Sequence, residues 1–415
     1  MTFPLGAAVT IAELTADPHP ALRRLRAAEP VSWLPALGGW LVTRRDLAEQ
    51  VLRDARGFTV DDPRFTTARV VGPSMLSLDG GEHRRHRDPF ARALRRGDVS
   101  AGLAAFCAEE ASRLVAALAA GSGASGAGAS GAGASGAGAS RAGASGAELR
   151  RGLAGPLAVA VMAEVLGLRD VDPATLLSWY DAIVSGVSDL TRAGPAAPVP
   201  AASAAAVRAL AESMAPVIRA PGGTSLLAAA AAAGGLTIAE VTSNAAVMLF
   251  GGIETTEGMI VNALLYLLGD PAAVAAVTAD RSLAGGVIDE SLRLEPAAAV
   301  VDRYATAEVR LGGAAVGAGD LVVVSLAGAN RDPAFFPEPD RFDPQRSNAR
   351  QNLAFALGPH FCVGAQLAQL ETEAAVTAVL DGLPGLRLDP ARPAAPRGLV
   401  FRKPPALHVR WDAGA

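Results

Sequence analysis

A cysteine in a glycine- and proline-rich run is the residue of this sequence best suited to chemistry. Cys362 lies in the segment 355–364, which reads FALGPHFCVG, and is one of only two cysteines in 415 residues. An apolar, helix-patterned stretch, 363–380, begins directly after it. Free backbone N–H groups and the dipole at a helix N-terminus favour a thiolate over a thiol. Cys362 is therefore a candidate metal ligand that could bind iron from one side and leave the opposite face open.

A second candidate lies in the middle of a long predicted helix. Thr237 and Glu240 form a capping-box pattern, and the helix is expected to run from Ile238 to about Leu268. Residues 251–256 at its centre read GGIETT, and each glycine costs a helix about 1 kcal/mol relative to alanine. One interpretation is a close helix–helix contact, with the threonine hydroxyls bonded to carbonyls one turn earlier. The other is a site where a flat ligand approaches the glycines while the acid and alcohol handle protons.

Two further motifs are charged. Glu290 and Arg293 lie three residues apart on a predicted helix, a spacing that by itself is typical of a surface ion pair. The run 80–87, GGEHRRHR, concentrates positive charge and places His83 and Arg87 on one helix face. That geometry suits binding a carboxylate or phosphate. Taken alone, a solvated basic helix face is the simpler interpretation.

The elements that must position these residues form a mostly helical chain with sheet at both ends. Segments 31–34 and 39–42 flank a Pro/Gly turn and predict a hairpin. Residues 79–294 are rich in helix formers, whereas 309–324 and 399–411 favour strands. We therefore expect a mainly α fold with small β-sheets.

Residues 121–146 form a near-perfect repeat of Gly, Ala and Ser, interrupted by Arg141. This composition is typical of a flexible linker and cannot build a packed core. We expect a flexible insertion inside a single domain that spans residues 1–415. A silk-like stacked structure is the remote alternative.

Composition limits the classes of function. Half of the residues are apolar and a fifth are charged, which allows a large core. The formal net charge of −4 gives no electrostatic basis for binding nucleic acid. Cys107 and Cys362 lie in different surroundings, so a disulfide framework is not expected. Residues 1–17 lack a leader pattern, and we expect no membrane span and a soluble, cytoplasmic protein.

Together these motifs resemble those of the cytochrome P450 family, in its soluble bacterial branch. The resemblance runs from about Asp17 to Trp411 and leaves only the Gly/Ala/Ser insertion outside it. Four motifs occur in the expected order: His83/Arg87, the segment 252–255, Glu290/Arg293 with Arg341, and the Cys362 run. The resemblance implies the P450 fold, with haem b held between the long central helix and the helix that follows the cysteine.

The resemblance also implies roles for individual residues. Cys362 would be the iron ligand, and its electron donation favours cleavage of the O–O bond. Glu254 and Thr255 would form the acid–alcohol pair that manages proton delivery. The other haem-contacting residues would be Gly251, Gly252, Phe355, Gly358 and Gly364, with His83, Arg87, Arg303 and His360 binding the propionates. Glu290, Arg293 and Arg341 would form a structural triad.

The implied reaction inserts one oxygen atom of O2 into a substrate, with electrons from NAD(P)H through a ferredoxin and its reductase. An acidic ferredoxin would dock on the basic helix 84–96. The distal cavity would be lined by Val247, Phe250, Ala299, Val300 and Val400. Because most of these are small or aliphatic, we expect a hydrophobic small molecule such as a secondary metabolite. We expect a monomer without nucleic-acid or membrane partners.

Three positions depart from the family pattern. Ala356 stands where glycine is usual, Gln369 where a basic residue often follows, and Asp340 where glutamate is usual. Alanine prefers an ordinary backbone conformation, so the turn before Gly358 is expected to be slightly shifted. None of the three touches the cysteine, and haem binding is still expected.

Three alternative functions differ in class. A peroxygenase that uses hydrogen peroxide can dispense with the acid–alcohol pair, so the presence of Glu254 and Thr255 weighs against it. A non-catalytic haem-thiolate protein would form no product. A cysteine-nucleophile or zinc enzyme built on His360 and Cys362 is disfavoured, because the chain has only two cysteines and five histidines, without a second pair at zinc spacing.

Overall fold

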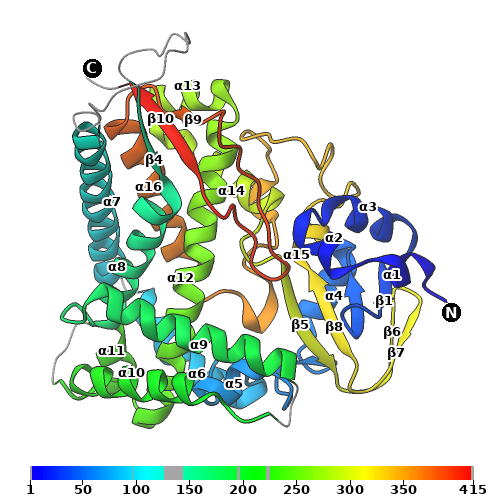
Figure 1. Ribbon diagram of the computed structural model, residues 1–415. Coiled ribbons are helices and arrows are strands. Elements are labelled where there is room, and N and C mark those ends of the chain that lie inside the picture. The colour runs from blue at the N-terminus through cyan, green and yellow to red at the C-terminus, as the bar shows by residue number, and fades with distance from the viewer. Residues whose placement is uncertain (1, 96, 126–143, 194–196, 221–224, 413–415) are drawn as a thin grey trace, which may run out of the picture.

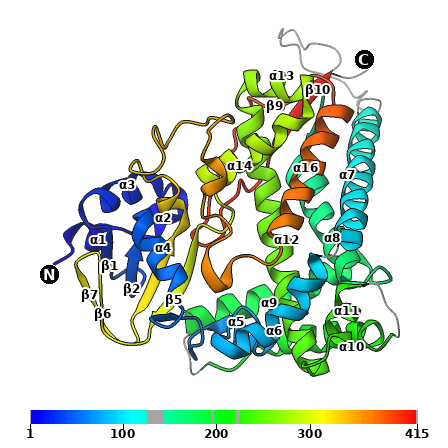
Figure 2. The same ribbon diagram turned by 180° about the vertical axis from the view of Figure 1, so that it is seen from behind.

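The structure is a computed structural model that describes residues 2–95, 97–125, 144–193, 197–220 and 225–412. It has two regions: a helical body, and a smaller β-rich region that carries the N-terminus (Figure 1). Seen from behind, α12 runs through the helical body, with the β-rich region on one side of it and α16 and α7 on the other (Figure 2).

The β-rich region combines an N-terminal segment of the chain with residues 300–325. Its main sheet has the strand order β1 (Val31–Leu34), β2 (Gly39–Val42), β8 (Leu321–Ser325), β5 (Val300–Ala305) and β3 (Phe58–Thr59). The predicted hairpin is confirmed, because β1 and β2 pair antiparallel with Trp33 opposite Trp40. Strand β2 then pairs parallel with β8, and β5 pairs antiparallel with β8 and β3. Smaller sheets are β4 (Ala144–Glu148) with β10 (His408–Asp412) and β9 (Arg387–Leu388), and β6 (Val309–Leu311) with β7 (Ala314–Val316).

Short helices accompany this sheet and longer ones build the body. Those of the β-rich region are α1 (Pro4–Ala8), α2 (Ile11–Ala16), α3 (His19–Ala28), α4 (Arg45–Arg53) and α15 (Leu326–Ala329). Those of the body are α5 (Thr66–Val71), α6 (Gly80–Leu94), α7 (Gly97–Ser125), α8 (Gly155–Leu166), α9 (Pro173–Ala193), α10 (Ala201–Arg219), α11 (Leu226–Ala232), α12 (Ile238–Leu268), α13 (Pro271–Ala279), α14 (Ala284–Leu294) and α16 (Ala365–Gly382). The predicted mainly α fold with small sheets is confirmed.

Helix α12 has the predicted bounds. The Thr237 side chain accepts from the Glu240 N–H, and the Glu240 carboxylate accepts from the Thr237 N–H, which completes the capping box. At the other end the Asp270 side chain caps the next helix, α13. The neighbours that pack along α12 are α8, α10, α14 and α16.

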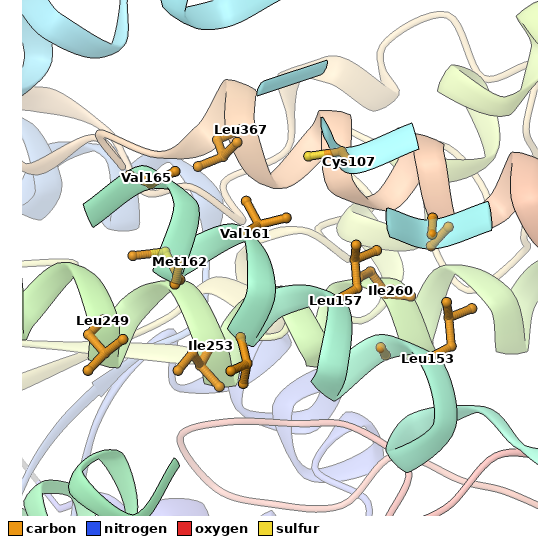
Figure 3. Packing of buried hydrophobic residues seen from close by; sticks show 14 of the residues in the cluster. Cys107, Leu153, Leu157, Val161, Met162, Val165, Leu249, Ile253, Ile260 and Leu367 are labelled. Atoms are coloured by element: carbon orange, nitrogen blue, oxygen red, sulfur yellow. The ribbon is translucent and has the colours of Figure 1, made fainter. Parts of the chain in front are cut away.

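The largest core cluster lies where α7, α8, α12 and α16 meet (Figure 3). Leu157 and Val161 of α8 are completely buried, as is Ile260 of α12. Cys107 of α7 and Leu367 of α16 lie on the opposite side of α8 in this view. This apolar contact holds the centre of α12 at a fixed position in the body.

The predicted insertion is shorter than its sequence repeat. Helix α7 continues through Gly121 to Ser125, and β4 begins at Ala144 and pairs with β10. Alanine is the best helix former, and a strand ladder uses backbone groups whatever the side chains, so both ends of the repeat can join regular elements. The remainder, 126–143 with Arg141, lies outside the described residues, so the predicted flexibility stays a prediction.

Helix α10 is an exception to the expectation that no segment is long and apolar enough to span a membrane. By length and composition it is the one helix among the described residues that could do so by itself. Its buried residues recur every three or four positions: Ser203, Ala206, Leu210, Met214 and Ile218. This one-sided burial is the pattern of an amphipathic helix, and α10 packs against α9 and α12.

Candidate active site

The loop before Cys362 is closed by its own backbone and packed against α4. The Cys362 N–H donates to the Phe355 carbonyl at 2.9 Å. Gly358 has φ +72°, and a Cβ there would lie 3.1 Å from the Arg53 Cα and closer still to the Leu52 carbonyl oxygen. The missing side chain of Gly358 therefore makes room for the backbone of α4, and its predicted place beside a porphyrin stays a prediction.

Ala356 holds a conformation that glycine would hold without strain. Its φ is +57°, and it is one of two non-glycine residues with positive φ among those described. Its N–H donates to the Leu353 carbonyl at 2.8 Å, which fixes the turn. The expected shift of the turn is not seen. The alanine instead occupies the left-handed region, at a cost of about 1–2 kcal/mol.

Cys362 as a residue is exposed, but neighbouring atoms of the loop surround its thiol. Burial of the group within the loop raises its pKa, while the Gly364 N–H and the Arg87 guanidinium lower it less. The Gly364 N–H acts in the direction expected of a helix N-terminus, although desolvation of the thiol is the larger effect. Arg87 also donates to the Phe361 carbonyl at 2.5 Å.

Among the described residues, neither a disulfide nor a group of three or more metal ligands offers an alternative to this assignment. Cys107 and Cys362 are both free, which confirms that expectation. Cys107 is completely buried, and burial raises its pKa to about 12. Among the described residues no group of three or more His, Cys, Asp or Glu side chains could hold a metal ion. A conventional zinc site is therefore unsupported in this part of the chain.

The four predicted propionate ligands come from three parts of the fold. His83 on α6 is 3% exposed and its Nε2 has no hydrogen-bond partner, while its ring lies 4.3 Å from that of His360. Burial and the nearby His360 and Arg87 lower the pKa of His83 to about 4. Arg303 on β5 is 5% exposed, and its guanidinium donates to the Asp302 carbonyl at 2.7 Å. Buried donors without acid partners are suited to an incoming carboxylate.

Asp79, which the sequence did not single out, joins this group. Its carboxylate accepts from the Thr59 hydroxyl at 2.6 Å and the Val60 N–H at 2.8 Å. It also pairs with the Nε2 of His360 at 2.8 Å, so one ring nitrogen of that histidine already has a partner. Burial raises the pKa of Asp79, but these hydrogen bonds together lower it below its usual value. No pattern near residue 79 signals this contact, because its partners lie 19 to 281 residues away.

The two adjacent glycines of α12 serve different purposes. A Cβ on Gly252 would overlap the Met162 side chain of α8, which Figure 3 shows beside Leu249 and Ile253. A Cβ on Gly251 would meet no atom of the described residues within 4 Å, and the same holds for Gly364. The helix–helix interpretation is therefore right for Gly252, and the predicted ligand contact there is not supported. Gly251 and Gly364 are free to face a flat ligand.

The acid and the alcohol of α12 are not bonded to each other. The Thr255 hydroxyl donates to the Gly251 carbonyl one turn earlier. The Glu254 carboxylate accepts from the Tyr180 hydroxyl at 2.7 Å and pairs with Lys403 Nζ at 2.8 Å. Burial raises the pKa of Glu254, but Lys403 and then Tyr180 lower it below its usual value. Tyr180 and Lys403 were missed by the sequence reasoning, although Lys403 is the only lysine in the chain.

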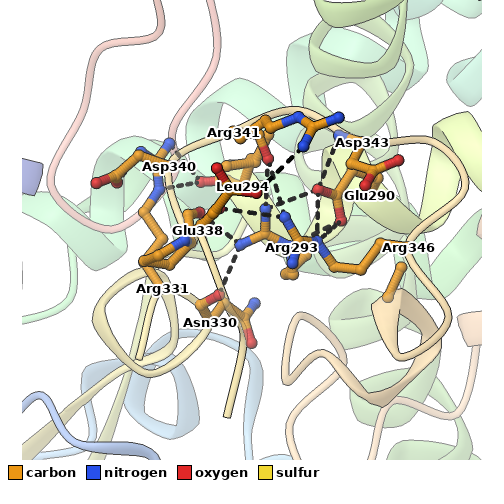
Figure 4. Close-up of polar contacts among 12 residues, drawn as sticks. Glu290, Arg293, Leu294, Asn330, Arg331, Glu338, Asp340, Arg341, Asp343 and Arg346 are labelled. Atoms are coloured by element: carbon orange, nitrogen blue, oxygen red, sulfur yellow. Dashed lines mark hydrogen bonds and ion pairs between the residues drawn. The ribbon is translucent and has the colours of Figure 1, made fainter. Parts of the chain in front are cut away.

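The predicted structural triad has a different third member. Glu290 and Arg293 are completely buried and pair at 2.7 Å. Figure 4 shows Arg346, not Arg341, completing the group, and its Nε lies 3.0 Å from Glu290. The prediction for Arg341 is wrong: its exposed guanidinium pairs with Glu338, and only its carbonyl accepts from Arg293. The chain reverses direction between the two arginines, which spacing alone could not reveal.

Most of the predicted substrate residues come together. The Ala299 N–H donates to the Val400 carbonyl at 2.8 Å, and Phe401 packs edge-on against Phe250 at 5.7 Å. Val300 packs in the same apolar cluster as Ala299, whereas Val247 lies in the main core of the body. Val400 is 44% exposed and so is the most accessible of the set.

Comparison with known proteins decides the family. The chain is 34% identical to the cytochrome P450 monooxygenase PikC of Streptomyces venezuelae, in an alignment covering 97% of this chain and 93% of that protein. The chain is a cytochrome P450. It is also 32% identical to nocardicin C N-oxygenase of Nocardia uniformis subsp. tsuyamanensis, over 99% of this chain and 98% of that protein. The cytochrome P450 family model matches residues 223–383.

Solved structures agree with this assignment. The P450 CYP109Q5 of Chondromyces apiculatus has a TM-score of 0.80 at 28% identity, covering 99% of this chain and 98% of that chain. The protein is thus a P450 monooxygenase that binds haem b, as the sequence motifs predicted. The residues present fit that cofactor: Cys362 offers a sulfur ligand, His83 an orphaned buried nitrogen, and Gly251 and Gly364 surfaces without side chains.

Proposed function

We propose that this P450 inserts one oxygen atom of O2 into a hydrophobic small molecule, with electrons from NAD(P)H passed through a ferredoxin and its reductase. The observation that carries the proposal is the site around Cys362. The Cys362 thiol just before α16, the unpartnered His83 nitrogen and the bare backbone of Gly251 belong to different elements. A haem bound through the thiol would supply the activation of O2.

The side chains around the haem have separable tasks in this proposal. His83, Arg87, Arg303 and the free ring nitrogen of His360 bind the two propionates, and each contact is charge-assisted. The Thr255 hydroxyl donates to the Gly251 carbonyl, and its oxygen can at the same time accept a hydrogen bond from a water and so hold it in place. The Glu254 carboxylate relays protons from solvent. The triad of Glu290, Arg293 and Arg346 keeps the segment behind the haem in place.

The proposed substrate is an apolar secondary metabolite. Phe250, Val300 and Val400 offer aromatic and aliphatic surface, and none of the three carries a charge. One relative's name identifies nocardicin C as its substrate, which makes a natural product a reasonable first class to test. A compound library screened for the low-to-high-spin shift of the haem would identify binders, and product formation would separate an enzyme from a passive haem protein.

The haem–thiolate assignment is tested by the spectrum of the reduced protein with carbon monoxide. The wild type is expected to show the thiolate-type Soret band. Cys362→Ser is expected to lose it, whereas Cys107→Ser, at the buried second cysteine, keeps it. A thiolate-type band that persists in Cys362→Ser would contradict the assignment of the iron ligand.

The source of electrons is tested with a substrate found by the spin-shift screen. Product formed with ferredoxin, reductase and NAD(P)H, and little formed with hydrogen peroxide alone, is the expected result. Equal turnover with peroxide would favour the peroxygenase alternative.

A docking surface for the ferredoxin is proposed on α6 and beside the cysteine loop. Arg84 and Arg92 are exposed on α6, and Arg95 is exposed directly after it. A groove of about 840 Å³ borders the loop and includes Arg350 and Phe361 in its lining. Arg92→Glu is expected to slow reduction about tenfold at low salt and less at high salt, while Arg24→Glu on the distant α3 is not. Equal rates of reduction in the two variants would show that the ferredoxin does not dock on α6.

A further inference from the structure

The only lysine of the chain is buried against the acid of α12. Lys403 stands alone among 37 Lys and Arg residues, and it is 9% exposed. Its Nζ lies 2.8 Å from Glu254 and also pairs with Glu257, one turn further along α12. A compact ammonium with three donors can bridge two carboxylates on one helix face.

Neighbouring residues fix the aliphatic part of the Lys403 side chain, while its ammonium can pair with either Glu254 or Glu257. The backbone of Lys403 forms an isolated bridge with Arg397. A Cβ on Gly258 of α12 would lie 3.6 Å from both the Cβ and the Cδ of Lys403, so the lysine stem crosses α12 at a glycine. The crossing point is one turn after Glu254. The ammonium is thereby delivered between the two carboxylates.

The charges of this cluster balance. Arg150 pairs with Glu257 at 2.8 Å, and Tyr180 donates to Glu254 at 2.7 Å. The charged and titratable groups that face Glu254 are Lys403, Tyr180, Glu257 and, beyond Glu257, Arg150. Because Glu257 keeps a partner in Arg150 either way, the ammonium can shift between the two acids without leaving a buried lysine unpaired.

The lysine also belongs to the segment that touches the proposed substrate residues. Val400 is 44% exposed and Phe401 packs on Phe250, two residues before Lys403 in the chain. Movement of residues 400–403 would therefore change the position of the ammonium that pairs with Glu254.

We propose that Lys403 is a positioning residue for proton delivery: its ammonium holds the Glu254 carboxylate away from Thr255 and releases it by shifting to Glu257. The proposal rests on the proposed function, because Glu254 has a proton to deliver only in a working monooxygenase. Lys403 itself touches neither substrate nor haem in this account.

The first test is an infrared titration of the oxidised holoenzyme. The carbonyl band of protonated Glu254 is assigned by its loss in Glu254→Gln. In Lys403→Met the midpoint of that band is expected to rise by about 1–3 pH units, because the ion pair that favours the carboxylate is gone. In Glu257→Gln it is expected to fall, because the ammonium then serves Glu254 alone. Midpoints that stay at the wild-type value, or move in the same direction, would overturn the proposal.

Two measures keep this test decisive if Lys403→Met does not fold. The double variant Lys403→Met/Glu257→Gln removes one charge of each sign and keeps the cluster balanced, and it too is expected to raise the midpoint. Selective ¹⁵N-lysine labelling of the reduced carbon monoxide complex gives one side-chain signal, since there is one lysine. That signal is expected to move in both Glu254→Gln and Glu257→Gln, and a response to only one of them would contradict the shared ammonium.

The second test asks whether the held acid matters for proton delivery. A plant-type ferredoxin with its reductase supplies electrons, no organic substrate is added, and the fraction of electrons recovered as hydrogen peroxide is followed against pH. The midpoint of this profile is expected to move up in Lys403→Met and down in Glu257→Gln, as in the infrared titration. An unchanged profile in both variants would defeat the proposal. A wild type without the thiolate-type spectrum would instead defeat the proposed function, while the titration still reports on Lys403.

Discussion

At the scale of single residues, the active site is made by a few exceptions to local rules. Ala356 adopts a left-handed backbone, His83 buries an unpartnered nitrogen, and the single lysine is buried between two acids. Each exception costs free energy that ordinary sequence choices would avoid. Such costs are most readily maintained where the surrounding fold or a cofactor compensates them.

Ala356→Gly is predicted to stabilise the protein. Glycine relieves a strain of about 1–2 kcal/mol but loses part of that gain by loosening the unfolded chain, so the free energy of unfolding should rise by about 0.5 kcal/mol. Urea denaturation of the holoenzyme measures it. Ala354→Gly, two residues earlier without a positive φ, is the control and is expected to destabilise.

At the scale of elements, α12 is fixed by different neighbours along its length. Gly252 accepts Met162 of α8, Gly258 accepts the Lys403 stem, and α14 carries the buried Glu290–Arg293 pair nearby. A helix that must fit so many neighbours gives up helix propensity for close contact. The low helix propensity at the centre of α12 therefore follows from close packing as well as from the proposed role in proton delivery.

The two glycines of α12 are predicted to respond oppositely to alanine. Gly252→Ala should lower the free energy of unfolding by about 1–3 kcal/mol, because the buried Met162 must move. In the haem-free protein, Gly251→Ala should raise the free energy of unfolding by up to about 1 kcal/mol, because alanine favours helix and its Cβ meets no atom of the described residues within 4 Å. Thermal unfolding compares the two. Adding Met162→Ala should rescue the first variant, and a lack of rescue would mean that the contact is not the cause.

Arg346→Met is predicted to be far more damaging than Arg341→Met. Removing Arg346, which is 8% exposed, leaves part of the buried Glu290 charge uncompensated, at a cost of about 3 kcal/mol. Arg341 is exposed, so its loss should cost less than about 0.5 kcal/mol. Urea unfolding and retention of haem after purification provide the measurement. Comparable losses of unfolding free energy in the two variants would indicate that Arg341 contributes to the triad as much as Arg346 does.

At the scale of the whole molecule, the site is assembled where distant parts of the chain meet. The β-rich region supplies Arg303, α6 supplies His83, and the loop before α16 supplies Cys362. Asp79 binds both β3 and His360 and so ties these parts together. The interpretation of residues 1–415 as one domain remains an inference, and the packing of α12 against helices from both halves of the chain supports it.

Asp79→Asn is predicted to destabilise the protein in a pH-dependent way. The folded pKa of Asp79 is lowered, so its contribution is present above its unfolded pKa near 3.8 and is lost as the pH falls further. At pH 7 the free energy of unfolding of the wild type should exceed that of Asp79→Asn by roughly 2 kcal/mol. This difference should become smaller only below about pH 4. Urea unfolding at several pH values measures this. Asp88→Asn, at an exposed position of α6, should unfold with the same free energy as the wild type at each pH.

The sequence by itself determined the family, the iron ligand candidate and the bounds of α12. These signals are local: a cysteine in a glycine turn, a capping box, and a helix centre that propensity disfavours. Local signals survive because neighbours in sequence remain neighbours in space.

Only the tertiary structure decided which residues those motifs meet. It replaced Arg341 with Arg346, turned Gly252 and Gly358 toward Met162 and the α4 backbone, and brought Lys403 to Glu254 across 149 positions of sequence. Such partners depend on how the chain folds back on itself, and one sequence carries no record of distances between remote side chains. The sequence predicted a role for Glu254 in proton delivery, whereas its pairing with Lys403 is known only from the tertiary structure.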